Sequence, residues 1–216
     1  MKRNELKDLI ISEFDSFAVG NGFTHRRGTV WYCVRNNIYL SIGFEKRSDG
    51  YIGSWSVYPL WEYNDVLHIS YGSNILFRTG FFSNVRYALS VYLTARQIYK
   101  GIRNIKRIFL TSVIPVLSAV TDAVSLRNTV NGSPLFCIGD FRKRLLAYCD
   151  AYNGDYENAV RLFEEYISRS GNPDNYKEEA NLVCIMKNTP DKVKEYLQSN
   201  IDKMVKQEKL IDYTEE

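Results

Sequence analysis

Apolar residues recur at helical spacing over the start of the chain. Leu6, Ile10, Phe14 and Phe17 follow one another every three or four residues, a pattern typical of a helix with one buried stripe. Glycines come next at positions 20 and 22, and glycine is common where helices end. The pattern predicts a helix over residues 2–19.

Apolar and polar residues then alternate from residue 26 to residue 58, which predicts an antiparallel meander. The pairs Asn36-Asn37 and Asp49-Gly50 have the composition of two-residue turns. These turns set registers in which Ile42 lies opposite both Trp31 and Val57. One face, the expected core, then collects Trp31, Cys33, Leu40, Ile42, Phe44, Trp55 and Val57.

The opposite face of this meander carries Tyr32, Tyr39 and Tyr58 with serines between them. Aromatic rings in such an arrangement can stack on nucleobases or form a protein-binding patch. Alternatively, later helices cover this face and the hydroxyl groups reach water.

The rest of the chain reads mainly as helical. Residues 66–72 are a candidate fourth strand, and the helical pattern begins near Ser83. Pro115 is expected to kink a helix or restart it. A further helix is expected from near Pro134 to residue 153, and Thr189-Pro190 has the composition of a helix start.

These elements predict an α+β fold with an N-terminal helix, an antiparallel meander of three or four strands, and a helical C-terminal half ending in helical hairpins. We expect an α+β domain over residues 1–133 and a helical-hairpin extension over residues 134–216, packed together as one unit.

Charge is distributed unevenly along the chain. The net charge is +3, but residues 1–152 carry a net +8 and residues 153–216 a net −5. A basic front is typical of proteins with an anionic partner. It is equally compatible with two solvated surfaces that attract each other.

Four basic residues form a row in the front half. Arg96, Lys100, Arg103 and Arg107 are spaced four, three and four residues apart, so a continuous helix would carry them on one face. Such a row could follow a phosphate backbone. Gly101 would splay the row if it ended the helix, and a solvated surface is the alternative interpretation.

Nothing in the sequence has the spacing of a catalytic or metal site. The chain has two histidines, His25 and His68, and four widely separated cysteines in apolar segments: Cys33, Cys137, Cys149 and Cys184. We therefore expect reduced, buried thiols. Cys33 paired with a histidine is a conceivable nucleophile, but it falls on the predicted core face. We expect no catalytic residue, no metal and no cofactor.

Charged residues interrupt every apolar run near the N-terminus, so no targeting signal is apparent. No window has the roughly 18 apolar residues of a membrane span. The sequence thus predicts a cytoplasmic protein that does not bind membranes.

Residues 148–167 resemble half of a tetratricopeptide repeat, through Gly154-Asp155-Tyr156, Ala159 and Phe163. No second copy follows at the repeat's period of about 34 residues, so the resemblance implies a single helical hairpin.

Residues 5–170 resemble the bacterial domain of unknown function 4304. The shared order is a starting helix, Gly22-Phe23, a strand at Trp31-Tyr32, the meander, a proline-containing helix around Val113–Leu117, and the hairpin that contains GDYENA. The resemblance implies this fold and a bacterial source, without an activity.

We therefore expect a non-catalytic binding or interaction protein with a protein partner, in a setting such as toxin neutralisation or phage defence. The alternative is a nucleic-acid-binding protein that uses the basic row, with or without an unrecognised hydrolase activity.

Overall fold

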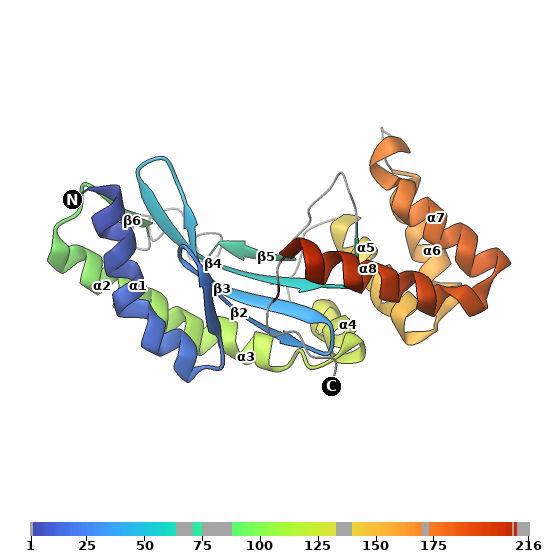
Figure 1. Ribbon diagram of the computed structural model, residues 1–216, viewed down its shortest axis with the longest axis horizontal. Helices are drawn as coiled ribbons and strands as arrows, with labels where there is room; N and C mark the ends of the chain where they lie inside the picture. The colour runs from blue at the N-terminus through green and yellow to red at the C-terminus, as the bar shows by residue number, and fades with distance from the viewer. Residues whose placement is uncertain are drawn as a thin grey trace. The chain divides into compact units, whose positions relative to one another are not determined.

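The computed structural model describes residues 2–63, 71–74, 88–132, 140–169, 173–208 and 210. The chain forms two units, drawn in Figure 1. The first unit consists of Met1–Cys33, Tyr39–Val57 and Gly72–Ser118, and the second of Val34–Ile38, Tyr58–Tyr71 and Ala119–Glu216.

Six strands within the described residues form one sheet in the order β1-β2-β3-β4-β5, with β6 paired to β4. The strands are β1 (Thr24–Arg27), β2 (Val30–Arg35), β3 (Ile38–Lys46), β4 (Gly50–Pro59), β5 (Tyr71–Asn74) and β6 (Ala88–Ser90). The helices of the first unit are α1 (Arg3–Gly20), α2 (Ala95–Ile108), the π-helical turn η3 (Phe109–Val113) and α3 (Ile114–Ser118).

Helix α1 confirms the predicted first helix to within one residue at each end. It ends where Gly22 adopts a φ of 83°, a left-handed conformation that glycine adopts without steric cost. The Phe23 N–H then donates to the Ala18 carbonyl (3.1 Å) and the Gly22 N–H to the Val19 carbonyl (3.0 Å). These two bonds form a Schellman motif, which satisfies carbonyls that the helix end leaves unpaired.

The turn between β2 and β3 is the predicted Asn36-Asn37 pair. Both asparagines have positive φ, 43° and 63°, as a type I′ turn requires. Asparagine tolerates this region better than most residues, so the prediction is confirmed and has a local cause.

The turn between β3 and β4 differs from the prediction by one residue. The Arg47 N–H donates to the Gly50 carbonyl (2.8 Å), so the turn residues are Ser48 and Asp49 rather than Asp49 and Gly50. At the far end of the strand pair, the Leu60 N–H donates to the Asn37 carbonyl (2.7 Å).

This pairing shifts the predicted register by two residues. Ser41 lies opposite Ser56, with their hydroxyl oxygens 2.6 Å apart, and Ile42 lies opposite Trp55 rather than Val57. Because side chains alternate with a period of two, a shift of two leaves every residue on its predicted face.

Gly50 explains the shift, since the sheet needs this glycine inside β4. Gly50 pairs with Ser90 of β6, and a Cβ at position 50 would lie 1.9 Å from the Leu89 carbonyl oxygen. The glycine therefore permits close approach of the neighbouring strand instead of forming the turn.

The core of the first unit lies between the predicted sheet face and the helices. Trp31, Leu40, Ile42, Phe44, Trp55 and Val57 are all buried, as predicted. The Phe14 ring of α1 packs against Trp31, Phe44 and Phe109, with centroids 4.9–5.5 Å apart. Cys33 is only half-buried, so its placement in the core was wrong.

Strand β6 corrects the predicted helix from Ser83. Ala88–Ser90 pairs antiparallel with Gly50–Ile52, whereas Ser83 lies outside the described residues. Helix α2 starts only after Thr94, whose N–H donates to the Gln97 side chain (2.9 Å). Such a Thr-x-x-Gln capping box is a helix start signal.

Strand β5 contains the last two residues of the candidate fourth strand, Tyr71 and Gly72, and its residues 66–70 lie outside the described part of the chain. A kink or a restart of the helix was expected near Pro115, and the type of helix changes just before this residue. The π-helical turn Phe109–Val113 separates α2 from α3, which begins at Ile114, because proline lacks the N–H of a regular helical bond.

The described part of the second unit from residue 119 onward is helical, as expected. Its helices are α4 (Ala123–Gly132), α5 (Asp140–Asn153), α6 (Tyr156–Ile167), α7 (Lys177–Asn188) and α8 (Val193–Glu208), with short 3₁₀ turns η4 (Pro173–Tyr176) and η5 (Pro190–Lys192). The predicted helix start at Pro134 lies outside the described residues. The division at residue 133 stays a prediction.

Helices α5 and α6 form the predicted hairpin. Gly154 turns the chain with a φ of 87°, and the Asp155 carboxylate accepts from the Asn158 N–H (3.3 Å) as an N-cap. Thr189-Pro190 begins the last helical segment, as expected, with Pro190 at the first position of η5. The α+β class with a helical C-terminal half is thereby confirmed.

Burial of the cysteines was predicted only in part. Cys149 is buried, but Cys184 is exposed. The buried stripe of α7 is Glu179, Leu182 and Met186, and Cys184 lies off this stripe despite its apolar neighbours. Cys137 lies outside the described residues.

Candidate functional site

The basic row lies on one uninterrupted helix. Arg96, Lys100, Arg103 and Arg107 all belong to α2 and are all exposed. Gly101 does not end the helix. It is buried, and a Cβ there would lie 2.6 Å from a methyl carbon of Leu89, so the glycine lets α2 pack closely on β6.

Among the described residues, no acidic group neutralises this row. Helix α2 contains no Asp or Glu, and none of the four cations forms an ion pair or hydrogen bond with another described residue. Lys106 behaves differently, because its ammonium group donates to the Glu13 carbonyl of α1. Lys106 is therefore not counted in the row, which consists of Arg96, Lys100, Arg103 and Arg107.

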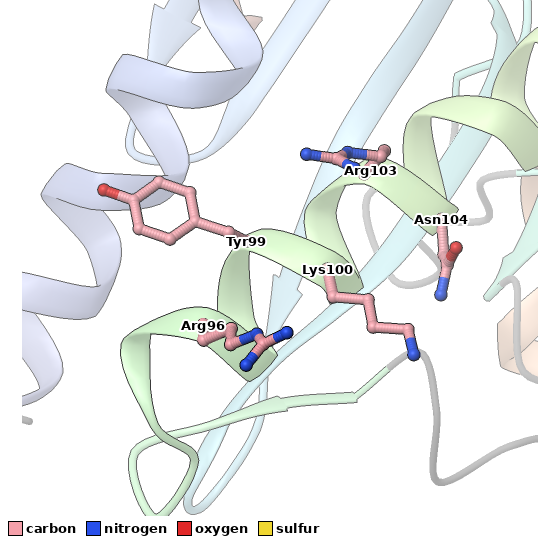
Figure 2. A pocket seen from close by; sticks show the side chains of 5 residues that line it. All are labelled: Arg96, Tyr99, Lys100, Arg103 and Asn104. Carbon is pink, nitrogen blue, oxygen red and sulfur yellow. The ribbon is translucent and has the colours of Figure 1, made fainter.

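Arg96, Tyr99, Lys100, Arg103 and Asn104 line a surface hollow on α2. Figure 2 shows Tyr99 and Arg103 pointing to one edge of the helix and Lys100 and Asn104 to the other. The Tyr99 side chain is 43% exposed. An aromatic ring and an amide thus lie among the cations, a combination that the basic row alone did not reveal.

The row concentrates positive charge over a short distance. Its ends are 11 residues apart, or about 16 Å along the axis, and the Debye length is about 8 Å at physiological salt. Guanidinium and ammonium groups bind anions through charge-assisted hydrogen bonds, so the arrangement suits binding of a negatively charged partner.

The structure brings two of the three predicted tyrosines together. The rings of Tyr32 and Tyr39 stack with centroids 5.4 Å apart and an angle of 13°, and Arg26 donates to the Tyr39 hydroxyl (3.2 Å). Tyr39 is only 9% exposed, which leaves little ring surface for a ligand. Tyr58 belongs to the second unit, where its hydroxyl donates to the Glu62 carbonyl (2.6 Å).

A buried polar network in the second unit escaped the sequence analysis. Arg144 of α5 is 0% exposed and forms ion pairs with Glu62 and, through Nε at 2.6 Å, with Glu179 of α7. It also donates to the Tyr71 hydroxyl (3.0 Å), which in turn donates to Glu62 (2.7 Å). We call Glu62, Tyr71, Arg144 and Glu179 the Arg144 network.

Tyr148 closes one side of this network. Its ring centroid lies 5.0 Å from the Arg144 guanidinium carbon, and burial raises the pKa of its hydroxyl well above the usual 10. For Arg144, burial lowers the pKa, but Tyr148 and Glu179 outweigh this effect and raise it overall. The cation therefore stays charged inside the unit, where it joins three chain segments.

A signal in the sequence points to this network. Arg144 precedes the buried Tyr148 and Ala151 by four and seven residues, and Glu179 precedes the buried Leu182 and Met186 by three and seven. Each charge therefore occupies an apolar stripe. Two opposite charges on such stripes indicate a buried ion pair, because an unpaired buried charge is too costly.

Other candidate chemistry is sparse. His25 is exposed, with Nε2 3.1 Å from the Gly28 carbonyl oxygen, and His68 lies outside the described residues. In the described part of the chain, no three His, Cys, Asp or Glu side chains are placed to bind a metal together. Nor does any helix there combine the length and apolarity that a membrane span requires.

Comparisons of the chain with models of known families, with curated proteins and with solved structures find no match. The resemblance to the domain of unknown function 4304 therefore stays a prediction.

Proposed function

We propose that this chain is a non-catalytic binding protein, and that the exposed basic face of α2 binds a partner with closely spaced negative charges. The observation that supports this is the row of Arg96, Lys100, Arg103 and Arg107, exposed and without an anionic partner among the described residues. The bacterial and cytoplasmic setting is part of the proposal and depends on the sequence alone.

The row has a cost for the free protein. Like charges three or four residues apart on a helix destabilise it by about 0.2–0.5 kcal/mol per pair. The row contains three such pairs, and hence costs roughly 1 kcal/mol. In α6, by contrast, Arg161 is paired with Glu165 at 2.7 Å. An anionic partner would neutralise the row on α2, as Glu165 neutralises Arg161.

The proposal is tested with heparin, a generic polyanion, as the immobilised probe. We expect the Arg96→Glu/Arg103→Glu variant to elute at a clearly lower salt concentration than the wild type. Lys192→Glu/Lys194→Glu is the matched control, because these lysines are exposed and the net charge changes equally. If both double variants elute at the same salt concentration, the α2 face is not the binding surface and the proposal is wrong.

A further inference from the structure

We infer that the partner is a single-stranded nucleic acid, whose phosphates lie along Arg96, Lys100, Arg103 and Arg107 while a base stacks on Tyr99. This inference depends on the proposed function, since it names the partner of the same face. It adds a ligand class and an aromatic contact residue, which the row of cations does not provide.

The position of Tyr99 within the row is the first observation. Tyr99 comes three residues after Arg96 and four before Arg103, or about 4.5 Å and 6 Å along the axis. Tyr99 and Arg103 point to the same edge of α2 (Figure 2). A strand held by the arginines would therefore pass beside the Tyr99 ring.

Exposure of the ring is the second observation. Tyr99 is 43% exposed and, among the described residues, forms no hydrogen bond, ring contact or ion pair. Tyr32 and Tyr39, by contrast, are stacked on each other. Tyr99 is thus a better candidate for base stacking than the tyrosine face predicted from the sequence.

A single strand fits this arrangement better than a duplex. In a duplex the faces of the bases are covered by neighbouring bases, so an aromatic side chain on a cationic row meets only sugar and phosphate. In a single strand each base offers a free face, and base–aromatic stacking beside a basic groove is the usual mode of binding. Asn104 also lines the hollow and points to the opposite edge of α2 (Figure 2), where it adds an amide that can donate to a base or a phosphate.

The salt dependence of binding measures the electrostatic contribution of the row to the affinity for a single strand. Single strands lose affinity with a slope of about 0.7 per neutralised phosphate, so four contacts predict a slope of about 2.8 and a roughly 50-fold loss between 50 and 200 mM salt. Arg103→Ala should lower this slope by about 0.7. Stacking carries no such slope, so the two contributions can be measured separately.

The test is a titration of the full chain against a fluorescent oligothymidine of about 12 nucleotides, the corresponding duplex, and heparin. We expect Tyr99→Ala to weaken single-strand binding at least about fivefold, with an unchanged salt slope and unchanged binding to duplex and heparin. Tyr99→Phe keeps the ring and should bind within about twofold of the wild type. Tyr92→Ala is the matched control, because Tyr92 is 85% exposed and does not line the hollow.

The outcomes separate the two proposals. If heparin binding depends on the row but Tyr99→Ala leaves single-strand binding unchanged, the inference is wrong and the proposed function stands. The same holds if the duplex, polyglutamate or vesicles of anionic lipid bind more tightly than the single strand. If no polyanion binds through α2, both proposals are wrong.

Discussion

The arginines of α2 and Arg144 place the same guanidinium group in opposite environments. Arg96, Arg103 and Arg107 are exposed and have no anion within the described fold. Arg144 is completely buried between Glu62 and Glu179. Where the fold provides the anion, the cation connects segments of the chain. Where it provides none, the cation remains available to a partner.

Desolvation explains why the two environments differ so strongly in energy. Removing a charge from water costs several kcal/mol per ion, and this cost is offset only if the partners and hydrogen bonds are complete. An exposed arginine keeps its hydration and incurs no such cost. Changes in the Arg144 network should therefore affect stability, whereas changes in α2 should affect binding.

The largest expected effect is that of Arg144→Met. This change leaves Glu62 and Glu179 buried without their cation, which should lower the free energy of unfolding by about 3–5 kcal/mol. Urea denaturation followed by far-ultraviolet circular dichroism measures it. A loss below about 1 kcal/mol would show that water reaches the carboxylates and that the network is not closed.

A second change tests whether this loss comes from the uncompensated carboxylates. Glu179→Gln removes one of the two uncompensated charges, so it should cost less in the Arg144→Met background than in the wild type. We expect a coupling of about 1–3 kcal/mol in the double-mutant cycle. Glu178→Gln, on the neighbouring residue, provides the control and should show a much smaller coupling with Arg144. Additive effects of the Arg144 and Glu179 changes would contradict the network.

Local signals in the sequence were sufficient for much of the fold. The asparagines at positions 36 and 37 tolerate positive φ, and the glycine at position 22 ends α1, so both boundaries follow from backbone preferences. Gly50 misled the prediction because the pair Asp49-Gly50 has the composition of a turn. The role of Gly50 is instead to let β6 approach β4. That role depends on a strand some 40 residues away and has no local signal.

The candidate site shows the same division. Spacing alone predicted the row on α2, since helical geometry decides which side chains share a face. Coordinates were required to show that no anion among the described residues neighbours the row, and to place Tyr99 in the hollow. The Arg144 network joins residues up to 117 positions apart, from Glu62 to Glu179, and their pairing depends on tertiary packing.

A smaller effect is expected at high pH. Burial raises the pKa of Tyr148 above that of an unfolded tyrosine, so the folded chain holds this proton more tightly. Below pH 10 both states are protonated and stability is unaffected. Above pH 10 the unfolded chain ionises first, and stability should fall by about 1 kcal/mol from this residue between pH 10 and 11.

Tyr148→Phe tests this linkage. The Tyr148 hydroxyl has no hydrogen-bond partner among the described residues, so its removal should be nearly neutral at pH 7. Urea denaturation at pH 10 and at pH 11 should show a smaller loss of unfolding free energy for the variant than for the wild type. Parallel losses would mean that Tyr148 ionises equally in the folded and unfolded chain.

The smallest expected effect distinguishes an unpaired helical arginine from a paired one. Arg103→Ala removes repulsion from Lys100 and Arg107 and introduces a better helix former, so α2 should gain a few tenths of a kcal/mol. Arg161→Ala in α6 breaks contacts with Glu165 (2.7 Å) and Asn158 (2.6 Å), which should offset the gain in helix propensity. Thermal unfolding of the two variants side by side measures the difference. If Arg103→Ala instead destabilises the protein by more than about 1 kcal/mol, Arg103 has a structural partner and the row is not free for a ligand.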